Sequence, residues 1–219
     1  MSIILNDLEA LIIELCDLET DYFNLMCTNK YYHKLISKNK LFMQWKECYQ
    51  KIKCFVQWKK CFSVWKNHRD KNKYFTEACK NGLLLFSKYL VSKYDININI
   101  ANDYAFRASC QNGHLDIAKW LIELSTKHGY KLVDIHAYNE EAFRQSCLMG
   151  NLAVAKWLIE LSEKPEFKLI NIHKYCDDAF NDSCHYGHLD VAEWLIELSK
   201  KPGFTPISNE TITRHYHPK

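Results

Sequence analysis

The sequence lacks the features that mark several large classes of protein. No apolar run approaches the roughly 20 residues that cross a membrane as a helix. The first residues, 2–7, carry neither the basic start nor the cleavage site of a secretion signal. These absences predict a protein that has no transmembrane segment, is not secreted and works in the cytoplasm.

Motifs that mark catalysis are missing as well. The chain has no Gly-rich phosphate loop, no Gly-x-Ser-x-Gly and no His-Glu-x-x-His, and its ten cysteines include no Cys-x-x-Cys pair. Cys184, His185 and His188 could ligate a metal, but His188 repeats His114 after a glycine, which favours a structural role. The sequence therefore predicts no enzyme, no cofactor and no metal site.

An internal repeat is what the sequence does contain. The stretch AFRASCQNGHLDIAKWLIELS at residues 105–125 returns in close copies at 142–162 and 179–199, and an eroded copy precedes it. One glycine marks each copy, 31 residues from the next in the first case and 37 in the others: Gly82, Gly113, Gly150 and Gly187. Periods of about 20 to 50 residues indicate stacked supersecondary units. We therefore expect about four repeats over residues 74–206.

Each unit is predicted to be two antiparallel helices. Ala105, Phe106, Ser109 and Cys110 recur at helical spacing on one face, and the Asn-Gly that follows stops the helix because glycine adopts the left-handed conformation. The second helix carries a second apolar stripe and a tryptophan, such as Trp157, which we expect in the core. Between copies runs an extended polar connector with the pairs Ile98-Asn99, Ile135-His136 and Ile172-His173.

The unit resembles the ankyrin repeat. The resemblance rests on Gly-His-Leu-Asp at residues 113–116 and 187–190 and on the apolar second helix. It departs from the family at the Thr-Pro-Leu-His opening, replaced here by Ala-Phe-Arg or Ala-Phe-Asn, and in its longer connectors at 126–133 and 163–170. The Trp-Leu-Ile-Glu-Leu variant is similar to ankyrin proteins of giant, mimivirus-like DNA viruses of amoebae. The resemblance implies an all-α, ankyrin-type helical repeat solenoid that binds a protein target.

The candidate binding surface consists of first-helix positions that differ between copies. Scaffold positions are fixed by packing, whereas variable ones are free to suit a partner. In an ankyrin-type stack these positions would line the concave side. The candidate partner-binding residues are Arg107, Gln111, Arg144, Gln145, Met149, Asn181, His185 and Tyr186.

Residues 1–45 lack the repeat and are predicted to form a small helical module. Their order of leucines, an acidic turn and a late tryptophan resemble an F-box. An F-box implies docking onto a Skp-family adaptor of a cullin-type ubiquitin ligase through Leu5, Leu8, Ile12 and Leu25. The alternative is a plain helical cap that shields the first repeat.

Residues 46–73 are strongly basic, with nine Lys or Arg against two acids. Their aromatic residues, among them Phe55, Trp58 and Trp65, fall on one face of a predicted amphipathic helix. The spacing favours a stripe that packs on the first repeat, with solvated lysines behind it. Binding to nucleic acid or to an anionic membrane surface is the alternative, and we expect no nucleic-acid binding at physiological salt.

Two functions follow from these features. In the first, a monomeric, non-enzymatic adaptor holds a target on its repeats and docks it to a ubiquitin ligase through residues 1–45. In the second, the repeats form an interaction scaffold whose N-terminal module is only a cap. Residues 207–219 are expected to be a C-terminal tail.

Overall fold

The computed structural model describes residues 71–127 and 129–216. The F-box-like module predicted at 1–45, with Leu5, Leu8, Ile12 and Leu25, lies outside the described residues. So does the predicted basic helix up to residue 70. The chain divides into two compact units, one of residues 1–71 and 85–94 and the other of 72–84 and 95–219.

The described residues form helices and no strands, as the all-α prediction requires. None of these helices is long and apolar enough to cross a membrane. In chain order they are α5 (Lys71–Lys80), α6 (Leu84–Lys93), α7 (Ile100–Gln111), α8 (Leu115–Lys127), α9 (Ala137–Leu148), α10 (Leu152–Ser162), α11 (Lys174–His185), α12 (Leu189–Ser199) and α13 (Asn209–His215).

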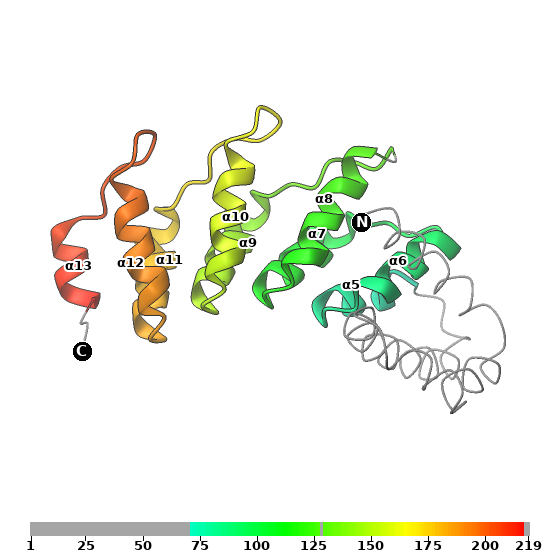
Figure 1. Ribbon diagram of the computed structural model, residues 1–219, viewed down its shortest axis with the longest axis horizontal. Coiled ribbons are helices and arrows are strands. Elements are labelled where there is room, and N and C mark those ends of the chain that lie inside the picture. Colours follow the sequence, from blue (N-terminus) through cyan, green and yellow to red (C-terminus); the bar gives the residue numbers. More distant parts are fainter. Residues whose placement is uncertain (1–70, 128, 217–219) are drawn as a thin grey trace, which may run out of the picture. The chain divides into compact units, whose positions relative to one another are not determined.

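The second unit is a row of antiparallel helix pairs (Figure 1). Helices α7 and α8, α9 and α10, and α11 and α12 form successive pairs, and the first helices pack in the order α7, α9, α11. The long connectors all emerge at the same edge of the row (Figure 1). This is the predicted helical solenoid. The segment 207–219, expected as a tail, contains α13, which packs on α11 where the next first helix of the row would lie.

The first unit contributes helix α6 to the described residues. Its apolar residues Phe86, Tyr89 and Leu90 are buried, and the rings of Phe86 and Tyr89 stack with centroids 6.3 Å apart. Ser87, between them in the sequence, is buried as well.

The repeated Ala-Phe-x-x-Ser-Cys pattern forms the core of the row. In α9, Ala142, Phe143, Ser146 and Cys147 are all buried, as their equivalents are in α7. The buried hydroxyl of Ser146 lies 3.2 Å from the carbonyl oxygen of Cys110, near the end of the preceding first helix. The same hydroxyl lies 2.7 Å from the carbonyl oxygen of Ala142 in its own helix, and the Cys110 carbonyl also accepts the N–H of Gly113 at 3.1 Å. The buried serine therefore contacts both its own helix and the end of the preceding first helix.

The glycine turn behaves as the sequence predicts. Gly113 has φ +78°, and the N–H of His114 donates to the carbonyl of Ser109 at 2.9 Å, which closes the helix end. The same bond joins Asn151 to Ser146 at 2.8 Å after Gly150. The chain can thus reverse into the second helix.

The residue after a turn glycine also lies against the turn glycine of the preceding repeat. A Cβ atom on Gly150 would overlap the ring of His188 in the next repeat, and one on Gly82 would lie 2.7 Å from the ring of His114. The glycines therefore leave room for the following repeat as well as supplying a positive φ. This contact supports the predicted structural role of His114 and His188.

The tryptophans correct one expectation. Trp157 is only half buried, because it lies on the seam between repeats and not in the middle of the core. Its ring packs against Phe106 of the preceding first helix at 6.3 Å, and Trp194 packs on Phe143 at the same distance. The indoles therefore join neighbouring repeats.

The connectors are anchored by apolar residues at alternate positions. Val133 and Ile135 are buried, as are Ile170 and Ile172, whereas the residues between them, Asp134 and Asn171, are exposed. This alternation is typical of an extended chain with one face on the core. It agrees with the predicted extended loop.

A left-handed turn opens the first helices α7, α9 and α11, though not α5, and the sequence did not predict it. Three successive residues without glycine have positive φ, from 52° to 65°, in each of these three helices. Left-handed backbone costs roughly 1–2 kcal/mol for each such residue, so other contacts must hold these turns. The turns are residues 101–103 in α7, 138–140 in α9 and 175–177 in α11.

Candidate partner-binding surface

Arg107 lies within the array and not on its free surface. Its side chain is 9% exposed. The guanidinium donates to the carbonyls of Ala101 and Asn102 in the left-handed turn, each at 2.9 Å, and forms an ion pair with Glu141 of the next repeat. It also lies over the ring of Tyr138, 4.4 Å from its centroid. One arginine thus stabilises a strained turn and joins two repeats.

Arg144 makes the same kinds of contact one repeat later, with one turn carbonyl in place of two. It donates to the carbonyl of Asn139 at 3.0 Å, pairs with Asp178 at 2.6 Å and lies 4.6 Å from the ring centroid of Tyr175. Asn181 takes the third such position and donates to the carbonyl of Cys176 at 2.9 Å. The variation between copies at this position therefore reflects contacts within the array.

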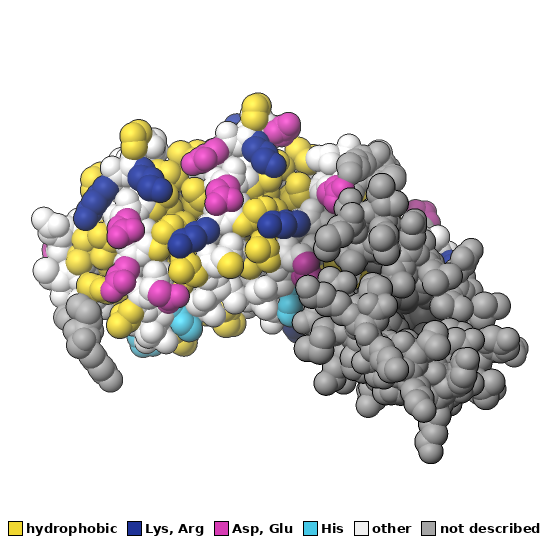
Figure 2. Space-filling view, viewed as in Figure 1, with side chains coloured by type: hydrophobic (Ala, Val, Ile, Leu, Met, Phe, Trp, Pro, Cys, Tyr) yellow, Lys and Arg dark blue, Asp and Glu magenta, His cyan; other side chains and the backbone are white. Residues whose placement is uncertain are grey.

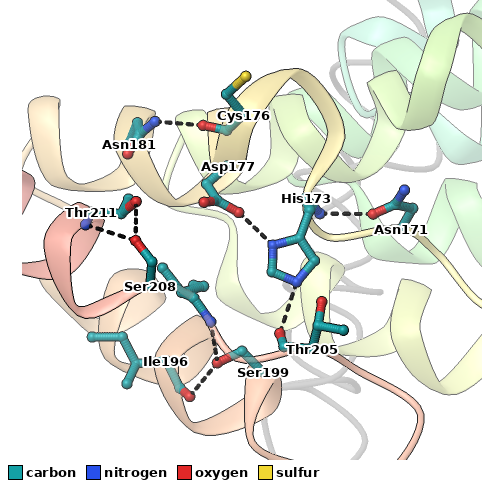
Figure 3. A network of polar contacts seen from close by, with 11 residues as sticks. Asn171, His173, Cys176, Asp177, Asn181, Ile196, Ser199, Thr205, Ser208 and Thr211 are labelled. Carbon is teal, nitrogen blue, oxygen red and sulfur yellow. Dashed lines mark hydrogen bonds and ion pairs between the residues drawn. The ribbon is translucent and has the colours of Figure 1, made fainter.

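Buried carboxylates tie each turn to the connector of the next repeat. Asp103 accepts the backbone N–H of Asp134 at 3.0 Å, and Glu140 accepts that of Asn171 at 3.3 Å. In the third copy, His173 lies between Asp177 and the carbonyl of Thr205, at 2.5 Å and 2.8 Å (Figure 3). These contacts fix where each connector runs.

The remaining candidate residues lie along the first helices and their ends. The side-chain amide of Gln111 donates to the side-chain oxygen of Gln145 in the next repeat at 3.0 Å, so these two candidate residues are linked to each other. Met149 and Tyr186 are 48% and 59% exposed. His185 is exposed and contacts Tyr186 edge-on, with ring centroids 5.0 Å apart. Met149, His185 and Tyr186, unlike the two arginines, are exposed and open to a partner.

Three tyrosines that the candidate set did not include belong to the same side of the repeats. Tyr104, Tyr138 and Tyr175 are 38%, 55% and 59% exposed, on the left-handed turns or directly after one. Tyr138 accepts a hydrogen bond from Asn102 at 3.3 Å, and Tyr175 accepts one from Asn139 at 2.8 Å. We call the exposed side chains of α7, α9 and α11, with their turns and C-terminal ends, the first-helix surface.

A polar hollow of about 290 Å³ lies at the start of this surface. Asp103, Asp134, Lys131 and Tyr138 line it together with Asn99, Asn102 and Ala137. Its polar lining suits a polar side chain rather than an apolar one.

The opposite side of the row has a different character. Figure 2 views it from α8, α10 and α12, where acidic and basic side chains are scattered among hydrophobic ones. Lys156 and Glu160 on α10, and Glu193 and Glu197 on α12, are exposed. Such mixed charges are typical of a solvated surface.

Comparison with known proteins identifies the repeat type. No curated protein matched the chain. Residues 75–168 match the family model of ankyrin repeats, which holds three copies. The match ends before α11, but α11 and α12 repeat the left-handed turn, the glycine turn and the Phe–Trp contact of the preceding pairs. The helix pairs within residues 75–168 are therefore similar to ankyrin repeats.

Proposed function

We propose that this protein is a non-enzymatic interaction scaffold that binds a target protein on the first-helix surface. One observation supports this most directly. Of the large hydrophobic side chains that are exposed among the described residues, all but Leu169 lie on the first-helix surface: Tyr104, Tyr138, Met149, Tyr175 and Tyr186. Tyrosine and methionine are enriched where proteins bind one another. None of them lies on α8, α10 or α12.

The test compares variants of the two surfaces by proximity labelling in the native cell. We expect Met149→Asn with Tyr186→Asn to lose the labelled partners of the wild type. Lys156→Ala with Glu160→Ala, on the opposite side, is the matched control and should keep them. Loss in the control and retention in the first variant would contradict the proposal.

The adaptor role of residues 1–45 is a further part of the proposal and rests on their resemblance to an F-box. The chain would then hold its target on the repeats and dock it to a cullin-type ubiquitin ligase in the cytoplasm. A Skp-family adaptor should co-purify with the full chain and be lost when residues 1–45 are deleted. Absence of adaptor from folded full-length protein would leave the scaffold function alone.

A further inference from the structure

The type of residue directly before the turn glycine changes along the array. In the first two copies it is asparagine. The side-chain amide of Asn81 donates to the carbonyl of Glu77 at 2.7 Å, and that of Asn112 donates to the carbonyl of Ala108 at 2.8 Å. Each of these carbonyls also accepts the backbone N–H of the same asparagine, at 3.1 Å, so the side-chain amide adds a second hydrogen bond at the helix terminus.

Met149 and Tyr186 occupy this position in the last two copies. A methionine has no donor for the carbonyl, and no hydrogen bond of the described residues joins the Tyr186 hydroxyl to one. Both side chains are instead about half exposed. Two adjacent repeats thus lack the hydrogen bond that the asparagine side chain makes in the first two copies. In its place each has an exposed, largely apolar side chain. Stability given up at a particular site is typical of a functional surface.

An unpaired carboxylate lies beside this apolar pair. Asp182 is one turn before Tyr186 on α11, and Gln145 is one turn before Met149 on α9, so each lies on the same face as its partner. None of the ion pairs among the described residues includes Asp182. Partial burial and then the nearby Asp178 raise the pKa of Asp182, although Arg144 and His185 act in the opposite direction.

The array already shows how it holds a cationic side chain. Arg107 lies over Tyr138 and pairs with Glu141, and Arg144 lies over Tyr175 and pairs with Asp178. Asp182 and Tyr186 offer the same two groups, a carboxylate and a tyrosine ring, without an arginine of their own. Guanidinium groups suit this combination because they bind carboxylates in a fork and stack on aromatic rings.

We propose that the surface formed by Gln145, Met149, Asp182 and Tyr186 binds a segment of a partner protein that presents an apolar side chain next to an arginine. The apolar side chain contacts Met149 and Tyr186, and the arginine pairs with Asp182. This inference rests on the proposed function and specifies the chemistry of the partner.

The test uses the full chain on an array of 12-residue peptides. One set holds a Leu-Arg pair in a Gly/Ser background, and the matched set holds Leu-Glu. We expect at least tenfold stronger binding of the Leu-Arg set. Asp182→Lys should reverse that preference, whereas Lys156→Glu on the opposite side should leave it unchanged. Met149→Asn with Tyr186→Asn should abolish binding while the thermal melt stays at or above that of the wild type.

Other results would overturn the inference in distinguishable ways. If Leu-Glu peptides bind as well as Leu-Arg ones, and the asparagine variant loses both, the proposed binding function holds but the basic partner is wrong. A preference for Leu-Arg that survives Asp182→Lys would place the basic side chain elsewhere. Self-association of the chain that the asparagine variant abolishes would assign the surface to a second copy. Binding of neither peptide set contradicts the inference, and only loss of the proximity-labelling effect contradicts the proposed function.

Discussion

At the scale of single residues, Gly150 and Gly187 separate two demands on a turn glycine. Both have positive φ, +72° and +79°, but only a Cβ on Gly150 meets another side chain, the ring of His188. We expect Gly187→Ala to lower the free energy of unfolding by about 1–2 kcal/mol, the cost of left-handed backbone. Gly150→Ala should cost more. Urea unfolding of both variants measures the difference.

The double variant Gly150→Ala with His188→Ala is the control for this prediction. Removal of the ring should bring the cost of Gly150→Ala down to that of Gly187→Ala, measured against His188→Ala alone. Equal losses in the two single variants would mean that the histidine yields without cost and that the contact across repeats does not constrain the glycine.

The cysteines are expected to react in a fixed order. Cys176 is exposed, whereas burial raises the pKa of the Cys184 thiol to about 11 and raises those of Cys110 and Cys147 further. A raised pKa leaves less thiolate, which is the reactive form. Among the cysteines that the structure describes, Cys176 should be labelled first by iodoacetamide at pH 8 and Cys184 slowly. Cys110 and Cys147 should react only on unfolding, as peptide mass spectrometry can show. Labelling of Cys110 as fast as Cys176 would contradict the described core.

At the scale of elements, the left-handed turns depend on the arginines that cover them. Replacing Arg107 with Met removes two hydrogen bonds to turn carbonyls and the pair with Glu141. Hydrogen bonds of charged groups contribute about 1.5–3 kcal/mol each, so we expect urea unfolding to show a free energy of unfolding lower by about that amount. Asn181→Ala removes a single hydrogen bond between uncharged groups, to the carbonyl of Cys176, and should lower the free energy of unfolding by less.

A stable Arg107→Met variant would show that the turn is held by other groups, above all by the buried Asp103. Asp103→Asn, which keeps the shape and removes the charge, then tells the two explanations apart. A large loss in this variant would assign the turn to the carboxylate.

How much of these elements the sequence could predict depends on the kind of signal. The first helices, their glycine stops and the Ser-Cys core followed from spacing, because packing repeats with the helical period. The left-handed turns did not, since Tyr138 and Glu140 have no local preference for positive φ and only Asn139 between them is of a type that tolerates it. They are held by a side chain five residues further along the same helix and by contacts with the next repeat, which local patterns do not encode.

The arginines show the same limit at the candidate site. Arg107 and Arg144 looked like partner-binding residues because the third copy has Asn181 in their place. A signal of their actual role was nevertheless present, since an acid follows each arginine after the same interval, as Glu141 and Asp178. Exposure of Met149 and Tyr186, by contrast, could be inferred directly from the replacement of the capping asparagine.

At the scale of the whole molecule, stability should depend on where in the row a contact lies. Each repeat contacts only its neighbours, so a central seam supports both sides while a terminal seam supports one. Trp157 and Trp194 offer a matched pair, because each packs on the preceding phenylalanine at 6.3 Å with nearly the same ring angle, 56° and 57°. The chemical change to alanine is then the same and only its position differs.

We expect Trp157→Ala to raise amide hydrogen exchange from α7 through α12, and Trp194→Ala to raise it only in α11, α12 and α13. Because both indoles are half buried, each substitution should lower the free energy of unfolding by less than the roughly 3–5 kcal/mol expected for a fully buried tryptophan. Exchange followed by mass spectrometry resolves the helices separately. If Trp194→Ala opened α7 as strongly as Trp157→Ala does, the repeats would unfold as a single cooperative block, and the seam between neighbours would not be the unit of stability.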